Sequence, residues 1–135
     1  MIVLDSSVLV GIIKVEEVSE RLVDLLGTEE CAIGAPTLVE TRIWCAANLA
    51  ARTSRWLEEF ISGPGVSVVP FTRDMADAAS QAFAAFGRAS RHPARLNFGD
   101  CLSYAASAVM RAPLLFKGRD FALTDVLVHP ASIRT

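Results

Sequence analysis

The chain opens with Met1-Ile2-Val3-Leu4-Asp5-Ser6-Ser7-Val8-Leu9-Val10. A short apolar run that ends at an acid is typical of a strand buried on both faces, as in the centre of a parallel sheet. Asp5 then lies where this strand ends, and Ser6 or Ser7 could cap a helix that starts directly after it. Ligands of open α/β sheets bind at the carboxyl ends of the strands, so Asp5 is placed for chemistry. The alternative is that Asp5 belongs only to the helix cap.

The composition predicts one folded unit. A length of 135 residues and a hydrophobic fraction of 52% favour a single domain, residues 1–135, that buries roughly two thirds of its unfolded surface. No apolar run approaches the roughly 18 residues of a membrane span, and no signal peptide is recognisable. The three cysteines form no CxxC pair, and their odd number favours reduced thiols in the cytoplasm. With two histidines, a structural zinc site is not expected.

Turn residues and hydrophobic periodicity divide the chain into alternating helices and strands. Helices are predicted over residues 6–14, 15–26, 36–50, 52–61, 72–86 and 97–110, and further strands over 31–34, 66–71, 112–116 and 126–128. Asn97 and Asp100 have the spacing of a capping box at the start of the last helix. The alternation predicts an α/β fold with a mainly parallel sheet of four to five strands, covered by helices on both sides.

Four acids fall near the ends of these predicted elements. Asp5 closes the first strand, Asp120 follows the strand at 112–116, and Glu40 and Asp100 lie in the first turns of helices. Each also has a simpler interpretation, because acids complement a helix N-terminus and aspartate is common in turns. In the same way, the stripe that Asp100 forms with Ser103, Tyr104 and Ser107 is compatible with a solvated helix face.

A cluster of these four acids would need a positive charge. Two like charges about 4 Å apart repel by roughly 4 kcal/mol at an effective dielectric near 20. Oxygen ligands without histidine or thiolate select Mg²⁺ or Mn²⁺, and such an ion binds phosphate oxygens and activates water. The net charge of −2 argues against nucleic-acid binding by phosphate neutralisation alone. A metal held by the acids removes this objection, because the metal attracts the phosphodiester.

Basic residues lie in the segments next to the acids. Arg88, Arg91 and Arg95 are in a predicted loop before Asp100, and Lys117 and Arg119 are beside Asp120. They are candidates for contacts with backbone phosphates, Lys117 above all because it leaves a predicted strand on the side of Asp5. The alternative is a solvated loop with scattered charges.

Four segments, in this order, resemble one known family. They are Met1-Ile2-Val3-Leu4-Asp5-Ser6-Ser7, Glu40 after Ala35-Pro36, Leu96-Asn97-Phe98-Gly99-Asp100-Cys101-Leu102-Ser103-Tyr104-Ala105, and Leu114-Leu115-Phe116-Lys117-Gly118-Arg119-Asp120-Phe121. Together they are similar to PIN-domain ribonucleases, and more closely to the VapC toxins of bacterial toxin–antitoxin pairs. The resemblance covers essentially the whole chain. It implies a three-layer α/β/α sandwich and an endoribonuclease that depends on Mg²⁺, with Mn²⁺ as an alternative.

The resemblance also implies roles for individual residues. Asp5, Glu40 and Asp100 match the acidic core of the family, and Asp120 matches its more variable fourth acid, for which Asp125 is the alternative. Ser6 matches the small hydroxyl residue that helps to order the site. Family members form homodimers and are held inactive by a cognate antitoxin, so both partners are expected here, together with RNA. A receiver-like signalling module or a partner-binding domain without activity is the alternative.

Overall fold

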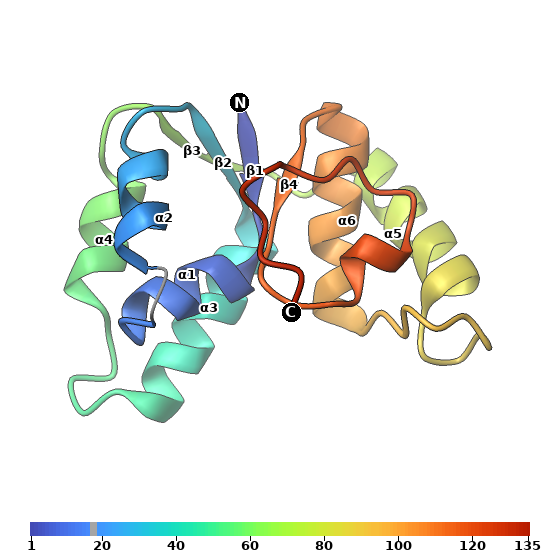
Figure 1. The fold of residues 1–135 in the computed structure, drawn as a ribbon, viewed down its shortest axis with the longest axis horizontal. Helices are drawn as coiled ribbons and strands as arrows, with labels where there is room; N and C mark the ends of the chain where they lie inside the picture. The colour runs from blue at the N-terminus through green and yellow to red at the C-terminus, as the bar shows by residue number, and fades with distance from the viewer. Residues whose placement is uncertain (17–18) are drawn as a thin grey trace.

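The computed structural model describes residues 1–16 and 19–135 and is built on a four-stranded sheet (Figure 1). The strands are β1 (Ile2–Leu4), β2 (Cys31–Gly34), β3 (Val66–Val69) and β4 (Leu114–Leu115), in the spatial order β3-β2-β1-β4. Every neighbouring pair is parallel. The predicted α/β fold with a parallel sheet is therefore confirmed, and the chain places the opening strand at its centre.

Helices cover the two faces of the sheet. They are α1 (Ser6–Ile13), α2 (Ser19–Leu26), α3 (Ala35–Asn48), α4 (Arg55–Ile61), α5 (Arg73–Phe86) and α6 (Phe98–Met110), with a 3₁₀ turn at Phe121–Leu123. In Figure 1, α1 to α4 lie on one side of the sheet, and α5 and α6 lie on the other. This is the predicted three-layer sandwich. The predicted helix over 15–26 includes residues 17 and 18, which lie outside the described residues, and α2 itself begins at Ser19.

Alternation along β1 separates two apolar cores. Ile2 and Leu4 pack with residues of α1 to α4, whereas Val3 packs with residues of α5 and α6. All three side chains are fully buried, as the continuous apolar pattern predicts for a central parallel strand. The two cores fix β1 from both faces, and they therefore fix the position of Asp5 at its end.

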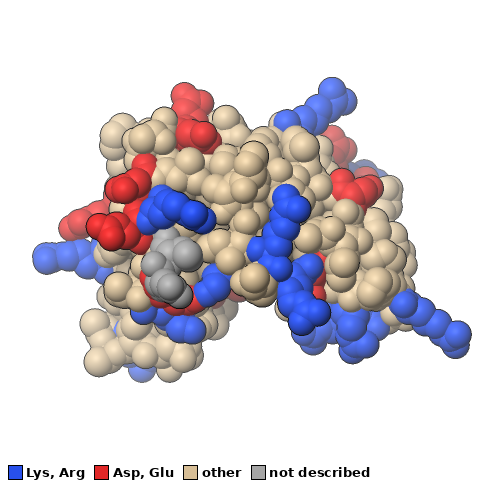
Figure 2. All heavy atoms as spheres, in the orientation of Figure 1, with Lys and Arg blue, Asp and Glu red and all other residues tan. Residues whose placement is uncertain are grey.

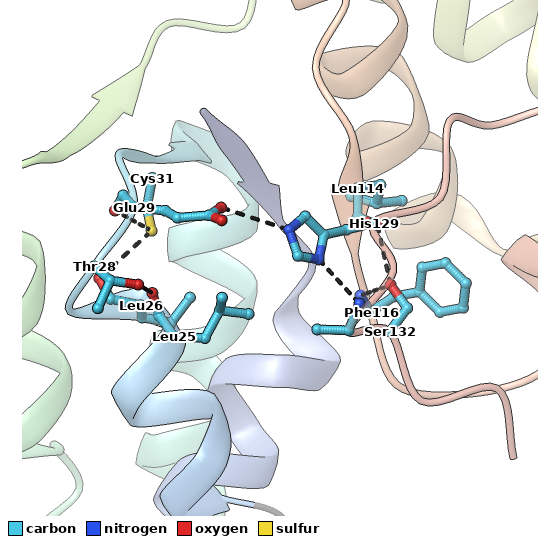
Figure 3. A network of polar contacts seen from close by, with 10 residues as sticks. Leu25, Leu26, Thr28, Glu29, Cys31, Leu114, Phe116, His129 and Ser132 are labelled. Carbon is cyan, nitrogen blue, oxygen red and sulfur yellow. Dashed lines mark hydrogen bonds and ion pairs between the residues drawn. The ribbon is translucent and has the colours of Figure 1, made fainter.

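The prediction of a fifth strand over 126–128 is wrong. Val128 makes only an isolated parallel bridge with Leu114, and the chain then turns, with the Ser132 N–H donating to the His129 carbonyl at 3.0 Å. The turn contains Pro130, which has no N–H to offer a ladder. Beyond it, the Ser132 hydroxyl accepts the Phe116 N–H at 3.3 Å (Figure 3). A side chain thus takes the place of a backbone partner, and the tail lies along β4 without forming a strand.

Within the part of the chain that the structure describes, no helix is long and apolar enough to cross a lipid bilayer. Cys31, Cys45 and Cys101 are all buried with free thiols.

Candidate metal centre

Asp5 is held at the junction between β1 and α1. Its backbone N–H donates to the Leu115 carbonyl at 3.0 Å, which continues the pairing of β1 with β4 for one more residue. Its side chain caps α1, because Oδ2 accepts the Ser7 N–H at 3.0 Å and the Ser7 hydroxyl at 2.5 Å. The prediction that Ser6 or Ser7 caps this helix is therefore wrong. Asp5 itself is the cap, and the residue is only 3% exposed.

The other oxygen of Asp5 is bound from across the molecule. Oδ1 accepts the hydroxyl proton of Ser103, on α6, at 2.6 Å. Ser103 is 1% exposed and Ser107 is 2% exposed, so the interpretation of this helix stripe as a solvated face is wrong for both serines. Sequence reasoning did not find this contact, because 98 residues separate Ser103 from Asp5.

Asp100 lies in the first turn of α6, where the predicted capping box is confirmed. The Asp100 N–H donates to the Asn97 side chain at 2.8 Å, and Asp100 Oδ2 accepts the Asn97 N–H at 3.0 Å. The pKa of Asp100 is raised from 3.8 to about 6, chiefly by burial and also by the negative charges of Asp5, Asp120 and Glu40, against the lowering effect of the Asn97 N–H. The helix cap alone therefore does not describe Asp100, which lies within the field of three other acids.

Glu40 is half-buried on α3 and faces the start of α6. Burial raises its pKa above 4.5 and the charge of Asp5 adds to this, while a hydrogen bond from the Ser6 side chain lowers it. Gly99 lies directly against the Glu40 carboxylate, and a methyl group on its Cα would overlap that carboxylate. Glycine at position 99 therefore lets Glu40 reach the site, and Ser6 lies beside Glu40 while Ser7 binds Asp5.

Asp120, and not Asp125, lies within the electrostatic reach of the other acids. Asp120 is exposed at the start of the 3₁₀ turn, and its charge contributes to the raised pKa of Asp100. Asp125 accepts the Tyr104 hydroxyl proton at 2.5 Å. Of the two alternatives for the fourth acid, Asp120 is the one whose charge contributes to the raised pKa of Asp100.

The basic residues predicted to contact phosphates differ in how exposed they are. Arg88 and Arg91 are exposed on the loop that leads to α6, as are Arg95 and Arg119 on their segments. Lys117 is half-buried and forms an ion pair with Glu16, while its N–H donates to the Ser7 hydroxyl at 3.0 Å. Figure 2 shows Lys and Arg side chains gathered along the lower margin of the molecule, toward which the carboxyl ends of the strands point in Figure 1.

The donor set of this site fits a hard divalent cation. Asp5, Glu40, Asp100 and Asp120 supply only carboxylate oxygens, which suit Mg²⁺ and Mn²⁺, and their mutual repulsion raises the pKa of Asp100. Among the described residues, no three acid, histidine or cysteine side chains are already arranged as a closed metal-binding group. The site therefore has the charge and the ligand chemistry for a cation. Its carboxylates lie at the edge of the sheet and do not already surround one common position.

Comparison with known proteins shows the family. The profile of the PIN domain matches residues 2–127, and the chain belongs to the PIN-domain family. It is 38% identical over 125 residues to Ribonuclease VapC28 of Mycobacterium tuberculosis, covering 92% of this chain and 94% of that protein. It is 37% identical to Ribonuclease VapC of Mycolicibacterium smegmatis, covering 92% and 96%.

A solved structure shares the fold. Mycobacterium tuberculosis VapC20, described as a Sarcin-Ricin loop cleaving toxin, superposes with a TM-score of 0.74 at 18% identity, over 96% of this chain and all of that one. At this identity the likeness concerns the fold alone. Family membership excludes the receiver-like alternative.

Proposed function

We propose that this chain is a divalent-metal-dependent endoribonuclease of the VapC toxin type, with Mg²⁺ or Mn²⁺ as its cofactor and RNA as its substrate. The observation that carries the proposal is the gathering of four acids, Asp5, Glu40, Asp100 and Asp120, from separate elements at one edge of the sheet. Relatives that match nine tenths of the chain are named ribonucleases.

The residues have distinct roles in this proposal. Asp5 and Asp100 hold the metal, since one is buried and fixed by hydrogen bonds and the other has a strongly raised pKa. Glu40 and Asp120 complete the charge and orient water. When bound, the ion would polarise the scissile phosphate and lower the pKa of the attacking water. Ser6 orders Glu40 through its hydrogen bond.

Arg88, Arg91 and Lys117 are the proposed contacts to backbone phosphates. The two arginines are exposed and available to a strand of RNA, whereas Lys117 must exchange Glu16 for a phosphate. Because such contacts are electrostatic, replacing Arg88 and Arg91 together with alanine should raise KM and flatten its salt dependence while kcat is kept.

The proposal is tested by mapping cleavage of total RNA with the purified protein. Cleavage is expected with Mg²⁺ or Mn²⁺, and it should stop with EDTA and in Asp5→Asn. A folded wild-type protein that cuts no RNA at any metal concentration would support a partner-binding domain without activity. Cleavage that continues unchanged in EDTA would exclude the metal-dependent mechanism.

An antitoxin is the proposed protein partner, and a surface groove between α1, α2 and α4 is its proposed docking site. The groove has a volume of about 550 Å³, its lining includes Ile13, Val15, Val23 and Trp56, and acids on α2 lie along it. An amphipathic segment with apolar and basic residues would match it. Val23→Arg should weaken neutralisation by the antitoxin encoded beside this gene and leave RNA cleavage by the free protein unchanged.

A homodimer is proposed through a second apolar groove, between α3, α5 and α6. This groove measures about 680 Å³, and Val39, Ile43 and Phe98 line it, with Phe98 77% exposed. Contiguous exposed apolar surface of this kind is typical of an interface. Ile43→Glu should shift the mass measured by light scattering from dimer to monomer. We also propose that the protein acts in the cytoplasm, because RNA substrates are found there and cysteines stay reduced there.

A further inference from the structure

Ser103 differs from Thr41 and Ser80, two other hydroxyl residues within helices, in the acceptor that it uses. A serine or threonine inside a helix usually donates to the carbonyl one turn earlier. Thr41 does so to Thr37 at 2.8 Å, and Ser80 does so to Ala76 at 2.9 Å. Ser103 is equally able to do this, yet its proton goes to Asp5 Oδ1 at 2.6 Å. The acceptor is a charged group of the candidate metal centre and not its own helix.

A residue of α3, Thr37, extends this hydrogen-bond chain. Thr37 and Ser103 have their hydroxyl oxygens 3.5 Å apart, and both side chains are buried. A hydroxyl has a single proton, and that of Ser103 is used on Asp5. Thr37 therefore donates to Ser103, and the chain of donors runs from Thr37 through Ser103 to Asp5. Figure 1 shows the three elements concerned, α3, α6 and β1, meeting near the middle of the molecule.

The same three elements carry three of the four acids. Thr37 lies three residues before Glu40 on α3, and Ser103 lies three residues after Asp100 on α6. Each is thus about one helical turn from the acid of its helix, on a side that faces the others. The Ser103 hydroxyl thus links the three elements that carry Asp5, Glu40 and Asp100.

A second hydroxyl holds the opposite oxygen of Asp5. Ser7 donates to Oδ2 at 2.5 Å while it accepts the Lys117 N–H at 3.0 Å. Both oxygens of Asp5 are thus held by hydroxyl groups that are themselves hydrogen-bonded to another element. Hydrogen bonds of this kind fix the orientation of a ligating carboxylate, and outer partners that orient metal ligands typically contribute 10- to 100-fold to metal affinity.

We propose that Ser103 is a positioning residue of the metal centre: it sets the orientation of the Asp5 carboxylate toward the acids on α3 and α6, and so sets the affinity for the divalent cation. The proposal rests on the proposed function of this site. It assigns no chemistry to Ser103 itself, which is buried at 1% exposure.

The test is Mn²⁺ binding to the whole protein without RNA, measured from the electron paramagnetic resonance signal of free Mn²⁺ at pH 7. Ser103→Ala is expected to bind Mn²⁺ about 10- to 100-fold more weakly than the wild type. Ser107→Ala is the matched control. Ser107 is a buried serine one turn further along α6, and its hydroxyl makes an equally short bond of 2.6 Å, but to the Ala112 carbonyl. Its loss should leave Mn²⁺ affinity unchanged.

The kinetic readout separates positioning from general damage. In RNA cleavage, Ser103→Ala should need more Mn²⁺ for half-maximal rate and recover most of kcat when Mn²⁺ is saturating, whereas a merely structural defect would not be recovered by metal. If Ser103→Ala does not fold, Ser103→Cys keeps the size of the side chain with a weaker donor, and it should show a smaller loss of affinity in the same direction.

The outcomes separate this proposal from the proposed function. Equal Mn²⁺ affinity in the wild type and the Ser103 variant, or an equal loss in Ser107→Ala, would overturn the role of Ser103 and leave the nuclease assignment intact. A wild-type protein that binds Mn²⁺ but cuts no RNA would overturn the nuclease assignment, and the loss of affinity in Ser103→Ala would still support the positioning role. Failure of the wild type to bind Mn²⁺ would overturn both.

Discussion

The two ends of the parallel sheet differ in whether their acidic side chains are paired with a basic side chain. At the amino end, Glu29 lies 3.5 Å from His129 Nε2, and the other ring nitrogen of His129 accepts the Ala131 N–H at 3.1 Å (Figure 3). At the carboxyl end, burial and the charges of Asp5, Asp120 and Glu40 raise the pKa of Asp100, and among the described residues no basic side chain contributes to the raised pKa of Asp100 or Glu40. One end satisfies its acid within the chain, whereas the other keeps its acids available for a cation from solution.

The largest expected effect is that of Asp5→Asn on RNA cleavage. Asparagine keeps the shape of the side chain, but its NH2 group cannot accept a hydrogen bond, so it offers an acceptor to only one of Ser7 and Ser103. It also loses the charge, so cleavage should fall by more than about 100-fold, the upper end of what an outer partner of a metal ligand contributes. The thermal unfolding temperature should change little. Gel-based cleavage assays and circular dichroism would measure the two. Full activity in a metal-replete Asp5→Asn protein would refute its role as a ligand.

The next largest effect is the stabilisation of the folded protein against unfolding when Mn²⁺ binds the acids at the carboxyl end of the sheet. Mn²⁺ at 100 times its Kd should stabilise the wild type by about 2.7 kcal/mol, because it binds only the folded state. The same concentration should leave the Asp100→Asn unfolding temperature almost unchanged. Differential scanning calorimetry with and without Mn²⁺ provides the comparison. Equal stabilisation of both proteins would place the ion away from Asp100.

Without metal, the stability of this end should depend on pH in a defined direction. The pKa of Asp100 is raised from 3.8 to about 6 in the folded state, so the folded protein holds a proton that the unfolded chain releases between these values. The stability contributed by this group is present below about pH 4 and is lost as pH rises through 6. In EDTA, Asp100→Asn should therefore gain unfolding temperature relative to the wild type between pH 4 and pH 7. An unchanged difference across this range would show that the pKa of Asp100 is not raised in the folded protein.

A smaller effect on cleavage is expected from Gly99→Ala. The added methyl group meets the Glu40 carboxylate, which is the movable end of a side chain, so the carboxylate should shift while the fold is kept. We expect a loss of about 10-fold, the lower end of the range for residues that orient a metal site. Gly63→Ala is the control, because its Cβ would meet backbone atoms far from the acids. If the two substitutions have the same effect on kcat, contact with Glu40 is not the reason for Gly99.

The smallest effect is expected at the amino end. His129→Ala removes the contacts with Glu29 and Ala131 and should lower the free energy of unfolding by about 1 kcal/mol, as for a typical hydrogen bond. RNA cleavage at saturating Mn²⁺ should stay at the wild-type rate. Chemical denaturation and the cleavage assay would measure both. A large loss of cleavage in a folded His129→Ala protein would contradict the division of roles between the two ends.

The parts of this fold that local chemistry determines could be predicted from the sequence. The buried run before Asp5 identified the central strand, and Asn97 with Asp100 identified the start of α6, because both signals lie within a few neighbouring residues. The tail was misjudged because Val126-Leu127-Val128 has the composition of a strand, while Pro130 and the Ser132 hydroxyl stop it from extending.

The hydroxyl partners of Asp5 were beyond sequence reasoning for a different reason. Capping by Asp5 instead of Ser6 or Ser7 depends on the direction in which one side chain turns at the end of β1. Ser103 reaches Asp5 only because α6 packs across β1, and nothing near position 103 in the sequence marks it as different from Ser107. Long-range contacts of this kind follow from the packing and have no local signature.

The path of the C-terminal tail along β4 has a consequence for assembly. Val128 and Ile133 occupy the outer side of β4 and the residues after it, and Pro130 keeps this margin irregular, so another chain has no regular row of backbone groups to join there. On the opposite margin, β3 carries the exposed side chains of Ser67 and Val68. Any partner that extends this sheet with a strand of its own must therefore do so beside β3.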